Sequence, residues 1–263
     1  MYKSRQMQEQ NKYRYFLELG FDGTAYHGWQ IQPNAISVQQ FLDEAISMVL
    51  REKISLTGAG RTDTGVHAKR YTAHFDSLQS PSLLHKPDLV YKLNRVLPAD
   101  IALYDLYPVR ADAHARYSAI SRSYEYRISR RKNPFLINKA WLQEREMNFG
   151  AMQEATSILF EYDDFECFSK SNTNVNHYRC KINEAHWRKE DHQWIFTICA
   201  NRFLRNMVRA IVGTLTDVGM GKINTEQMKQ IIESKDRSNA GYSVPGCGLY
   251  FLGAEYDRSI LLS

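Results

Sequence analysis

The stretch Thr57-Gly58-Ala59-Gly60-Arg61-Thr62-Asp63-Thr64-Gly65-Val66-His67-Ala68 decides how the rest of the chain is arranged. Its glycines let the backbone turn sharply or approach a ligand closely. A helical pattern precedes it, and a strand-like alternation follows at residues 69–76. We therefore predict a polar loop held between ordered elements, where catalytic side chains are commonly found. The alternative is a glycine-rich connection whose Asp and Thr side chains only satisfy turn hydrogen bonds.

The bulk composition is that of a globular protein of 263 residues, 43% hydrophobic and 24% charged. This length suffices for one large domain or two lobes. No apolar run approaches the roughly 20 residues that cross a bilayer. Residues 1–10 are polar and lack the features of a secretory signal. We expect a cytoplasmic protein without membrane association.

The cysteines and histidines give no recognisable metal site. The four cysteines, Cys167, Cys180, Cys199 and Cys247, contain no CxxC pair, and we predict reduced thiols. Cys167, His177, Cys180 and His186 could converge on zinc, but their spacing matches no standard site. Neither a Rossmann fingerprint nor a P-loop sequence occurs. We expect no metal and no other cofactor.

Positive charge is concentrated in one segment. Residues 110–145 contain nine basic and three acidic side chains, a difference of +6, whereas the whole chain carries +5. Tyr117, Tyr124, Tyr126, Phe135 and Trp141 are interleaved with these charges. Basic groups that meet phosphates, mixed with rings that stack on bases, suggest a nucleic-acid surface. A solvated basic face is the alternative.

Hydrophobic periodicity predicts an α+β fold. Strands are expected at residues 12–19, 69–76, 101–107, 124–128, 181–187, 194–200 and 249–256. Helices are expected at residues 38–49, 87–97, 149–160, 202–216 and 225–234. Ser37 and Gln40 suggest a capping box for the first helix. In the helix at 202–216, Arg202, Arg205 and Arg209 would share one side.

We predict two similar lobes that form a shared, mainly antiparallel sheet flanked by helices, with the active-site cleft between them. Residues 11–110 would form the N-terminal lobe with the aspartate loop. Residues 111–258 would form the C-terminal lobe, which completes the pocket and the RNA-binding surface.

The chemistry of the loop depends on one carboxylate. Asp63-Thr64-Gly65 has the tripeptide of an aspartic protease, but such enzymes pair two carboxylates, and no second copy occurs. A glycosidase also needs two carboxylates flanking the bond. One carboxylate beside arginines fits chemistry at C1′ of a nucleotide, which needs neither metal nor redox cofactor. Arg61 close to Asp63 would favour the ionised form.

Motifs along most of the chain carry a resemblance to a known family. Gly60-Arg61-Thr62-Asp63-Thr64-Gly65-Val66-His67-Ala68 closely resembles the signature of the tRNA pseudouridine synthase A family. The segments that resemble other parts of that family are Phe21-Asp22-Gly23-Thr24, Tyr26-His27-Gly28-Trp29-Gln30, Leu97-Pro98, Ala113-His114-Ala115-Arg116-Tyr117-Ser118-Ala119, Met207-Val208-Arg209 and Gly248-Leu249. Asp163 and Ala210 depart from the family pattern, outside the catalytic set.

The resemblance implies isomerisation of uridine to pseudouridine in tRNA, at positions 38–40 of the anticodon arm. Asp63 would be the catalytic aspartate, Arg61 would contact the RNA beside it, and Arg209 would pair with Asp63. Tyr124 would stack on the flipped uracil and Leu249 would line its pocket. Arg116, Arg122 and Arg205 are candidate RNA contacts. The resemblance also implies a homodimer with tRNA spanning both subunits.

Two alternatives belong to other classes of function. The first is a non-catalytic RNA-binding module that kept the fold; the intact set of Asp63, Arg61, Tyr124 and Arg209 argues against it. The second is a hydrolase that uses Asp63 and His67. We assign His67 no proton transfer and expect it to fix the loop through a hydrogen bond.

Overall fold

The computed structural model describes residues 12–84, 87–171, 173 and 175–262. Residues 1–10, judged free of a secretory signal, and residue 11, where the expected first lobe begins, lie outside the described residues.

Nine strands of the described residues form one sheet, with seven of them in the order β4-β1-β3-β9-β5-β8-β7, β2 beside β3 and β6 beside β5. The strands are β1 Tyr13–Phe21, β2 Thr57–Gly58, β3 His67–Ser77, β4 Ile101–Val109, β5 Ala119–Ser129, β6 Trp141–Leu142, β7 Ile182–Glu190, β8 Gln193–Ala200 and β9 Leu249–Tyr256. The α-helices are α1 Val38–Leu50, α2 Pro81–Leu84, α3 Pro87–Val96, α4 Phe149–Ser157, α5 Met207–Gly219 and α6 Thr225–Ser234.

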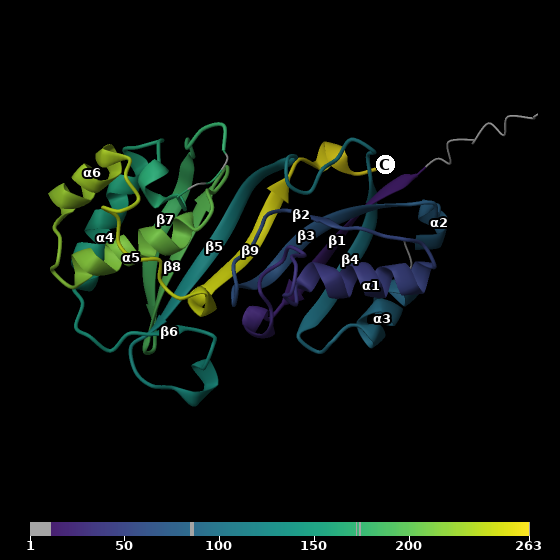
Figure 1. The fold of residues 1–263 in the computed structure, drawn as a ribbon, viewed down its shortest axis with the longest axis horizontal. Helices are drawn as coiled ribbons and strands as arrows, with labels where there is room; N and C mark the ends of the chain where they lie inside the picture. The colour runs from purple at the N-terminus through teal and green to yellow at the C-terminus, as the bar shows by residue number, and fades with distance from the viewer. Residues whose placement is uncertain (1–11, 85–86, 172, 174, 263) are drawn as a thin grey trace, which may run out of the picture.

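The last strand of the chain joins the two halves of the sheet. β9 lies between β3 and β5, where Figure 1 shows it in yellow at the centre of the molecule. It pairs parallel to β3 through His67 with Tyr250 and Ala68 with Phe251. It pairs antiparallel to β5. The other neighbouring strands along the main path are also antiparallel to one another. The prediction of a mainly antiparallel α+β sheet is confirmed.

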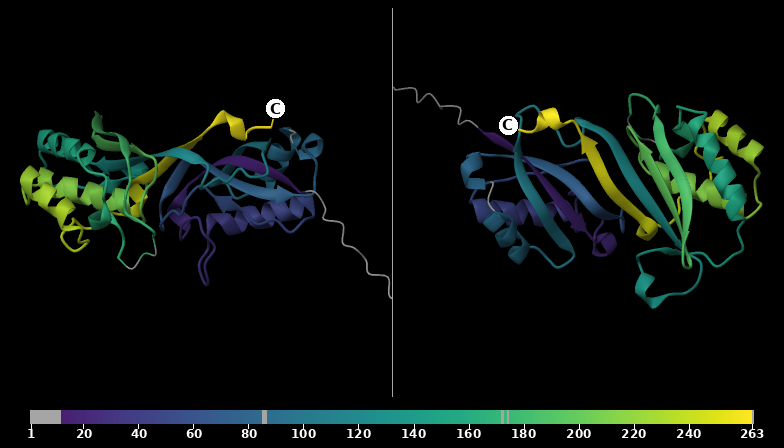
Figure 2. Two further views of the ribbon diagram at one scale, coloured as in Figure 1. Left: turned by 90° about the horizontal axis from the view of Figure 1, so that it is seen from above. Right: turned by 180° about the vertical axis from the view of Figure 1, so that it is seen from behind.

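Two hydrophobic cores lie against this sheet. One is built from β1, β3, β4 and the helices α1 and α3, and the other from β5, β7, β8 and the helices α4, α5 and α6. Figures 1 and 2 show α1 and α5 on the same side of the sheet. Tyr124 packs against both cores, and Leu249 and Phe251 of β9 each belong to one of them. The helix-bearing face therefore contains a seam between two packed halves.

β3 is buried on both faces for most of its length, so it does not show the expected alternation. On the helix-free face, Phe16, Val109, Ala113 and Ala115 form a third, small core. Because the segment after β4 covers this face, even the polar side chain of His74 in β3 is buried.

Two local predictions were wrong. The helix expected at 202–216 begins at Met207, because Asn206 has φ 69° and residues 202–205 are irregular. Arg202 and Arg205 are therefore not on this helix. At α1, Ser37 accepts from the Gln40 N–H, but the Gln40 side chain bonds Glu44, so the capping box is not reciprocal. A reciprocal box instead opens α6, between Asn224 and Gln227.

Within the described residues, no helix has the length and apolar character needed to span a membrane.

Candidate active site

The loop between β2 and β3 carries Asp63, and neighbouring backbone fixes it on both sides. The Trp29 N–H donates to Thr62 Oγ1 at 2.9 Å. The Gly65 N–H donates to the Tyr26 carbonyl at 3.2 Å. The residues next to Asp63 are thus tied to the loop that follows β1. A carboxylate presented from such a support keeps its direction when a substrate binds.

At two positions in this support a positive φ favours glycine. Gly28 has φ +91°, and a Cβ there would lie 2.1 Å from the Thr62 carbonyl oxygen. Gly65 has φ +74°, a left-handed conformation that side chains rarely adopt. In contrast, a Cβ at Gly60 would meet no atom within 4 Å. The close approach of the two loops therefore depends on Gly28, the local backbone conformation depends on Gly65, and neither depends on Gly60.

An ion pair crosses the seam to Asp63. Arg209, in the first turn of α5, donates from Nη1 to Asp63 Oδ2 at 2.7 Å. Its Nε donates to the Val244 carbonyl at 2.7 Å, so the guanidinium is held at two points. The two side chains are 26% and 20% exposed, which leaves the pair reachable from solvent. A charge-assisted hydrogen bond of this length fixes the orientation of the carboxylate.

Arg61, two residues before Asp63, does not form an ion pair with it in the part of the chain that the structure describes. Its side chain is exposed, and within the described residues it makes no hydrogen bond or ion pair. Arg209 provides the neighbouring positive charge instead. Arg61 is therefore free to contact a bound molecule at the mouth of the site.

Aromatic side chains form the wall next to the ion pair. The Tyr124 ring packs edge-on against Phe203, with centroids 4.9 Å apart, and against Phe251 at 5.2 Å. Burial raises the pKa of Tyr124 to about 12, and the negative charge of Asp63 adds to the rise. The hydroxyl is therefore neutral near pH 7. Leu249, in the same strand as Phe251, is 7% exposed and continues the apolar wall.

Arg122 differs from the other candidate RNA contacts because it is 9% exposed. Its guanidinium donates to the carbonyls of Ala59 at 3.3 Å, of Asn201 at 3.1 Å and of Arg116. These bonds connect the catalytic loop, through Arg122, to the segments of Arg116 and Asn201 in the other half. The side chain is thus used inside the protein, and we do not retain it as an RNA contact.

The other two candidate arginines remain at the surface. Arg116 and Arg205 are both exposed. The Arg116 guanidinium lies 5.5 Å from the centroid of the Tyr117 ring. Arg205 belongs to the irregular segment before α5, and within the described residues its guanidinium has no ion-pair partner. Arg205 can meet a phosphate without breaking an ion pair, and Arg116 can do so by leaving the Tyr117 ring.

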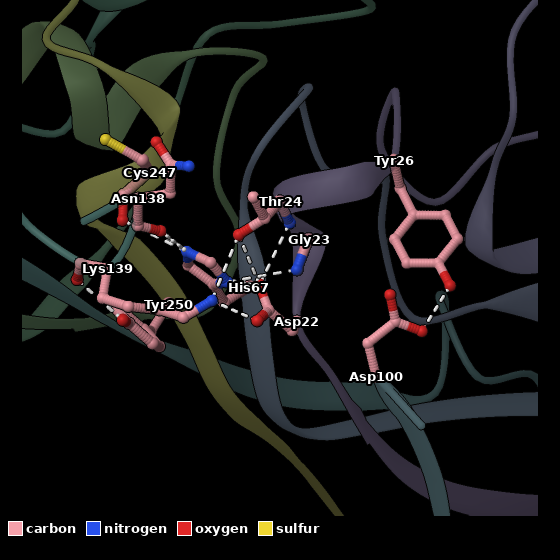
Figure 3. A network of polar contacts seen from close by, with 10 residues as sticks. All are labelled: Asp22, Gly23, Thr24, Tyr26, His67, Asp100, Asn138, Lys139, Cys247 and Tyr250. Carbon is pink, nitrogen blue, oxygen red and sulfur yellow. Dashed lines mark hydrogen bonds and ion pairs between the residues drawn. The ribbon is translucent and has the colours of Figure 1, made fainter. Parts of the chain in front are cut away.

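His67 joins three segments directly behind the catalytic loop (Figure 3). Its Nδ1 accepts from the Gly23 N–H at 3.1 Å, and its Nε2 lies 2.9 Å from the Asn138 carbonyl and 3.2 Å from that of Cys247. The ring stacks on Tyr250 with centroids 4.6 Å apart. Burial lowers the pKa of His67, so the ring is neutral near pH 7. These contacts give the residue a positioning role.

Lys139 reinforces the same junction. Its ammonium donates to Asp22, and to the Thr24 hydroxyl at 3.1 Å. Although burial raises it, the ammonium of Lys139 and the two hydrogen bonds that Thr24 donates to Asp22 lower the pKa of Asp22 to about 2. The network borders a hollow of about 550 Å³. Lys139 and Asp22 thus tie the segment after β5 to the end of β1.

The cysteines carry no metal-site geometry. All four are unpaired, and Cys167 and Cys180 are buried. Burial raises the pKa of Cys167 to about 12 and that of Cys180 to about 11. In the part of the chain that the structure describes, no three His, Cys, Asp or Glu side chains gather in a way that could hold a metal ion.

Sequence reasoning missed Val244 as a site residue. Its carbonyl accepts from Arg209 Nε, and its N–H donates to the Arg209 carbonyl at 3.3 Å. Both contacts use backbone atoms, which every residue type offers. No sequence signal could have identified this residue.

Comparisons with known proteins bear on this site. A family model described as tRNA pseudouridine synthase matches residues 162–257. A protein of Parabacteroides distasonis named tRNA pseudouridine synthase A is 46% identical over 250 residues, which are 94% of this chain and 97% of that protein. A protein of the same name from Bacteroides fragilis is 48% identical over 248 residues, 94% and 98% of the two chains. One from Thermoanaerobacter pseudethanolicus is 40% identical over 238 residues, 90% and 96% of the two chains.

Proposed function

The chain belongs to the tRNA pseudouridine synthase A family, and from this premise we propose that it isomerises uridine to pseudouridine in tRNA, at positions 38–40 of the anticodon arm. One observation carries the proposal for the site. The Asp63 carboxylate is held 2.7 Å from the Arg209 guanidinium across the seam, where Tyr124 packs against both cores.

Asp63 supplies the reactive group in this proposal. The reaction breaks the bond between C1′ and N1, turns the uracil, joins C1′ to C5, and moves a proton from C5 to N1. No electrons are gained or lost overall, so a redox cofactor is not required. Attack on C1′, attack on the base and removal of the C5 proton all use a carboxylate at this position. Arg209 keeps that carboxylate aimed at the substrate.

Tyr124 and Leu249 would hold the uracil while it turns. A base that undergoes such chemistry has to leave its stack, at a cost of a few kcal/mol. Stacking on an aromatic ring offsets about 1–3 kcal/mol of that cost. T-shaped contacts with Phe203 and Phe251 fix the orientation of the Tyr124 ring before the base enters.

Exposed arginines would hold the RNA around the site. Arg61, Arg116 and Arg205 lie on the surface, and within the described residues none of their guanidinium groups forms an ion pair. We propose that each meets the phosphate backbone. Arg61 is two residues from Asp63, so it would act closest to the displaced nucleotide. The +6 charge of residues 110–145 supports the same surface.

The larger organisation follows from the same premise. We propose that residues 11–110 and 111–258 act as two lobes around the site, that the protein works as a cytoplasmic homodimer, and that it needs no metal. Light scattering at micromolar concentration tests the dimer, for which the expected mass is twice the 30.6 kDa of one chain. A mass of one chain would refute this part.

The main rival is a non-catalytic RNA-binding module, and the second is a hydrolase. To separate them, purified protein is incubated with unmodified tRNA transcripts and pseudouridine is mapped at each position. We expect pseudouridine at positions 38–40 with the wild type and none with Asp63→Asn, which should still bind tRNA. Release of free uracil or strand cleavage would support the hydrolase. Binding without any isomerisation would support the module.

A further inference from the structure

A second aromatic feature of the surface lies away from Asp63. Tyr117, in the segment between β4 and β5, is 76% exposed. Its ring packs on His114 with centroids 4.4 Å apart, and His114 packs on the buried His74 at 4.6 Å. The outermost ring is therefore supported from one side by a column that reaches the third core.

The backbone fixes this column as firmly as the rings do. His114 Nδ1 accepts from the N–H groups of Arg116 at 3.0 Å and Tyr117 at 3.3 Å. The Ala115 N–H donates to His74 Nδ1 at 3.1 Å. Because both histidines accept hydrogen bonds at Nδ1, they are neutral in this arrangement. A large exposed ring is thus held in one orientation before any partner binds.

The column is connected to the catalytic loop. Arg122 donates to the Arg116 carbonyl and, with the same guanidinium, to the Ala59 carbonyl at 3.3 Å. His74 lies seven residues along β3 from His67, which is about 23 Å at the rise of a strand. The exposed ring and Asp63 therefore lie near opposite ends of β3 on one rigid support.

We propose that Tyr117 and Arg116 form a stacking site for one unpaired nucleotide of the tRNA, separate from the nucleotide that is isomerised. The base would stack on the ring in place of the Arg116 guanidinium, which lies over the ring at 5.5 Å from its centroid and would move to the adjacent phosphate. The proposal rests on the proposed function, because it assumes a tRNA substrate. By fixing a second point, this contact sets the register of the RNA relative to Asp63.

The test measures binding of an unmodified tRNA transcript at several salt concentrations. Tyr117→Ala should weaken binding roughly tenfold without changing the salt dependence, and Tyr117→Phe should bind like the wild type. Arg116→Ala should reduce the slope of log K against log salt by about one. Tyr91→Ala, which removes a 67% exposed ring on α3, is the matched control and should have no effect.

A cycle with abasic transcripts identifies the nucleotide. An abasic substitution at the stacked position should weaken binding by the wild type, and it should make no further difference to Tyr117→Ala. Equal tRNA binding by Tyr117→Ala and Tyr91→Ala would refute the stacking site. A fall from dimer to monomer mass in Tyr117→Ala would also refute it, because the ring would then contact a second copy of the chain. The proposed function fails separately, if the wild type forms no pseudouridine in the same transcript.

Discussion

Arg209 reaches Asp63 from the other half of the molecule, at 2.7 Å, while its Nε is held by the Val244 carbonyl. The distance along the chain between the two residues is 146 positions. Because the guanidinium is fixed at both ends, the relative position of the two halves determines the direction of the carboxylate. The seam is thus part of the active site.

Replacing Arg209 by lysine tests this geometry. A lysine keeps the positive charge but, unlike the planar guanidinium, cannot hold Val244 and Asp63 in the same fixed arrangement. We expect kcat to fall roughly 100-fold, because a small displacement of a reacting group such as the Asp63 carboxylate has an effect of this size. The affinity for tRNA should change little. Single-turnover kinetics and binding assays measure the two effects. Arg95→Lys, at an exposed residue of α3, is the control, and equal kcat values for both variants would contradict the positioning role.

Replacing Tyr124 by leucine removes the stacking surface of the pocket. We expect Tyr124→Leu to bind tRNA and to lose most activity. Tyr124→Phe should keep its activity, because the Tyr124 hydroxyl is neutral and, within the described residues, makes no hydrogen bond. The comparison is made by following pseudouridine formation with time. Normal turnover by Tyr124→Leu would show that the ring does not hold the uracil.

Local patterns predicted some elements to the residue. The helix at 225–234 and the strand at 249–256 both have the expected bounds, since Asn224 caps the helix and an apolar run after Gly248 opens the strand. The failure at 202–206 has a physical cause. Phe203 and Leu204 continue the helical periodicity, but they belong to an irregular segment packed on the core, and Asn206 adopts a left-handed conformation. Periodicity reports burial and not backbone angle.

Local sequence patterns do not predict contacts between segments that are far apart in the chain. Nothing in its sequence indicates that β9 enters the sheet between β3 and β5. That insertion brings Phe251 against Tyr124 and places Leu249 in the pocket wall. The burial of Arg122 has the same origin, because its carbonyl partners come from three separate segments. Amino-acid composition cannot distinguish such a buried arginine from one on the surface.

Adding one methyl group at Gly28 should disturb the catalytic loop. In Gly28→Ala, the Cβ would lie 2.1 Å from the Thr62 carbonyl oxygen at a φ of +91°, so the loops have to separate. We expect a loss of roughly 1–3 kcal/mol in the free energy of unfolding, measured with urea, and a large fall in kcat. Gly60→Ala, in open space within the same motif, should change stability by about 0.5 kcal/mol or less. Similar losses for both would mean that the close approach is not the cause.

The pH dependence of stability should report the buried His74. Burial lowers the pKa of His74 from 6.5 to about 4, and Arg14 and His114 add to the fall. Between these pH values the unfolded chain binds more protons than the folded one, so acidification lowers the free energy of unfolding, by about 3 kcal/mol at most. His67 and His114, whose pKa values burial also lowers, act in the same sense. Asp43 opposes them, because burial raises its pKa to about 6.

The contribution of His74 is therefore measured as the difference in the free energy of unfolding between the wild type and a His74 variant. His74→Asn keeps an acceptor for the Ala115 N–H but cannot titrate in this range. Urea unfolding from pH 7 to pH 4 should show a smaller loss of stability in this variant than in the wild type. His192→Asn, at an exposed turn, should follow the wild type. Parallel curves for His74→Asn and the wild type would mean that the ring gains a proton equally in the folded and unfolded states. That result would contradict the effect assigned here to the burial of His74 beneath the segment after β4.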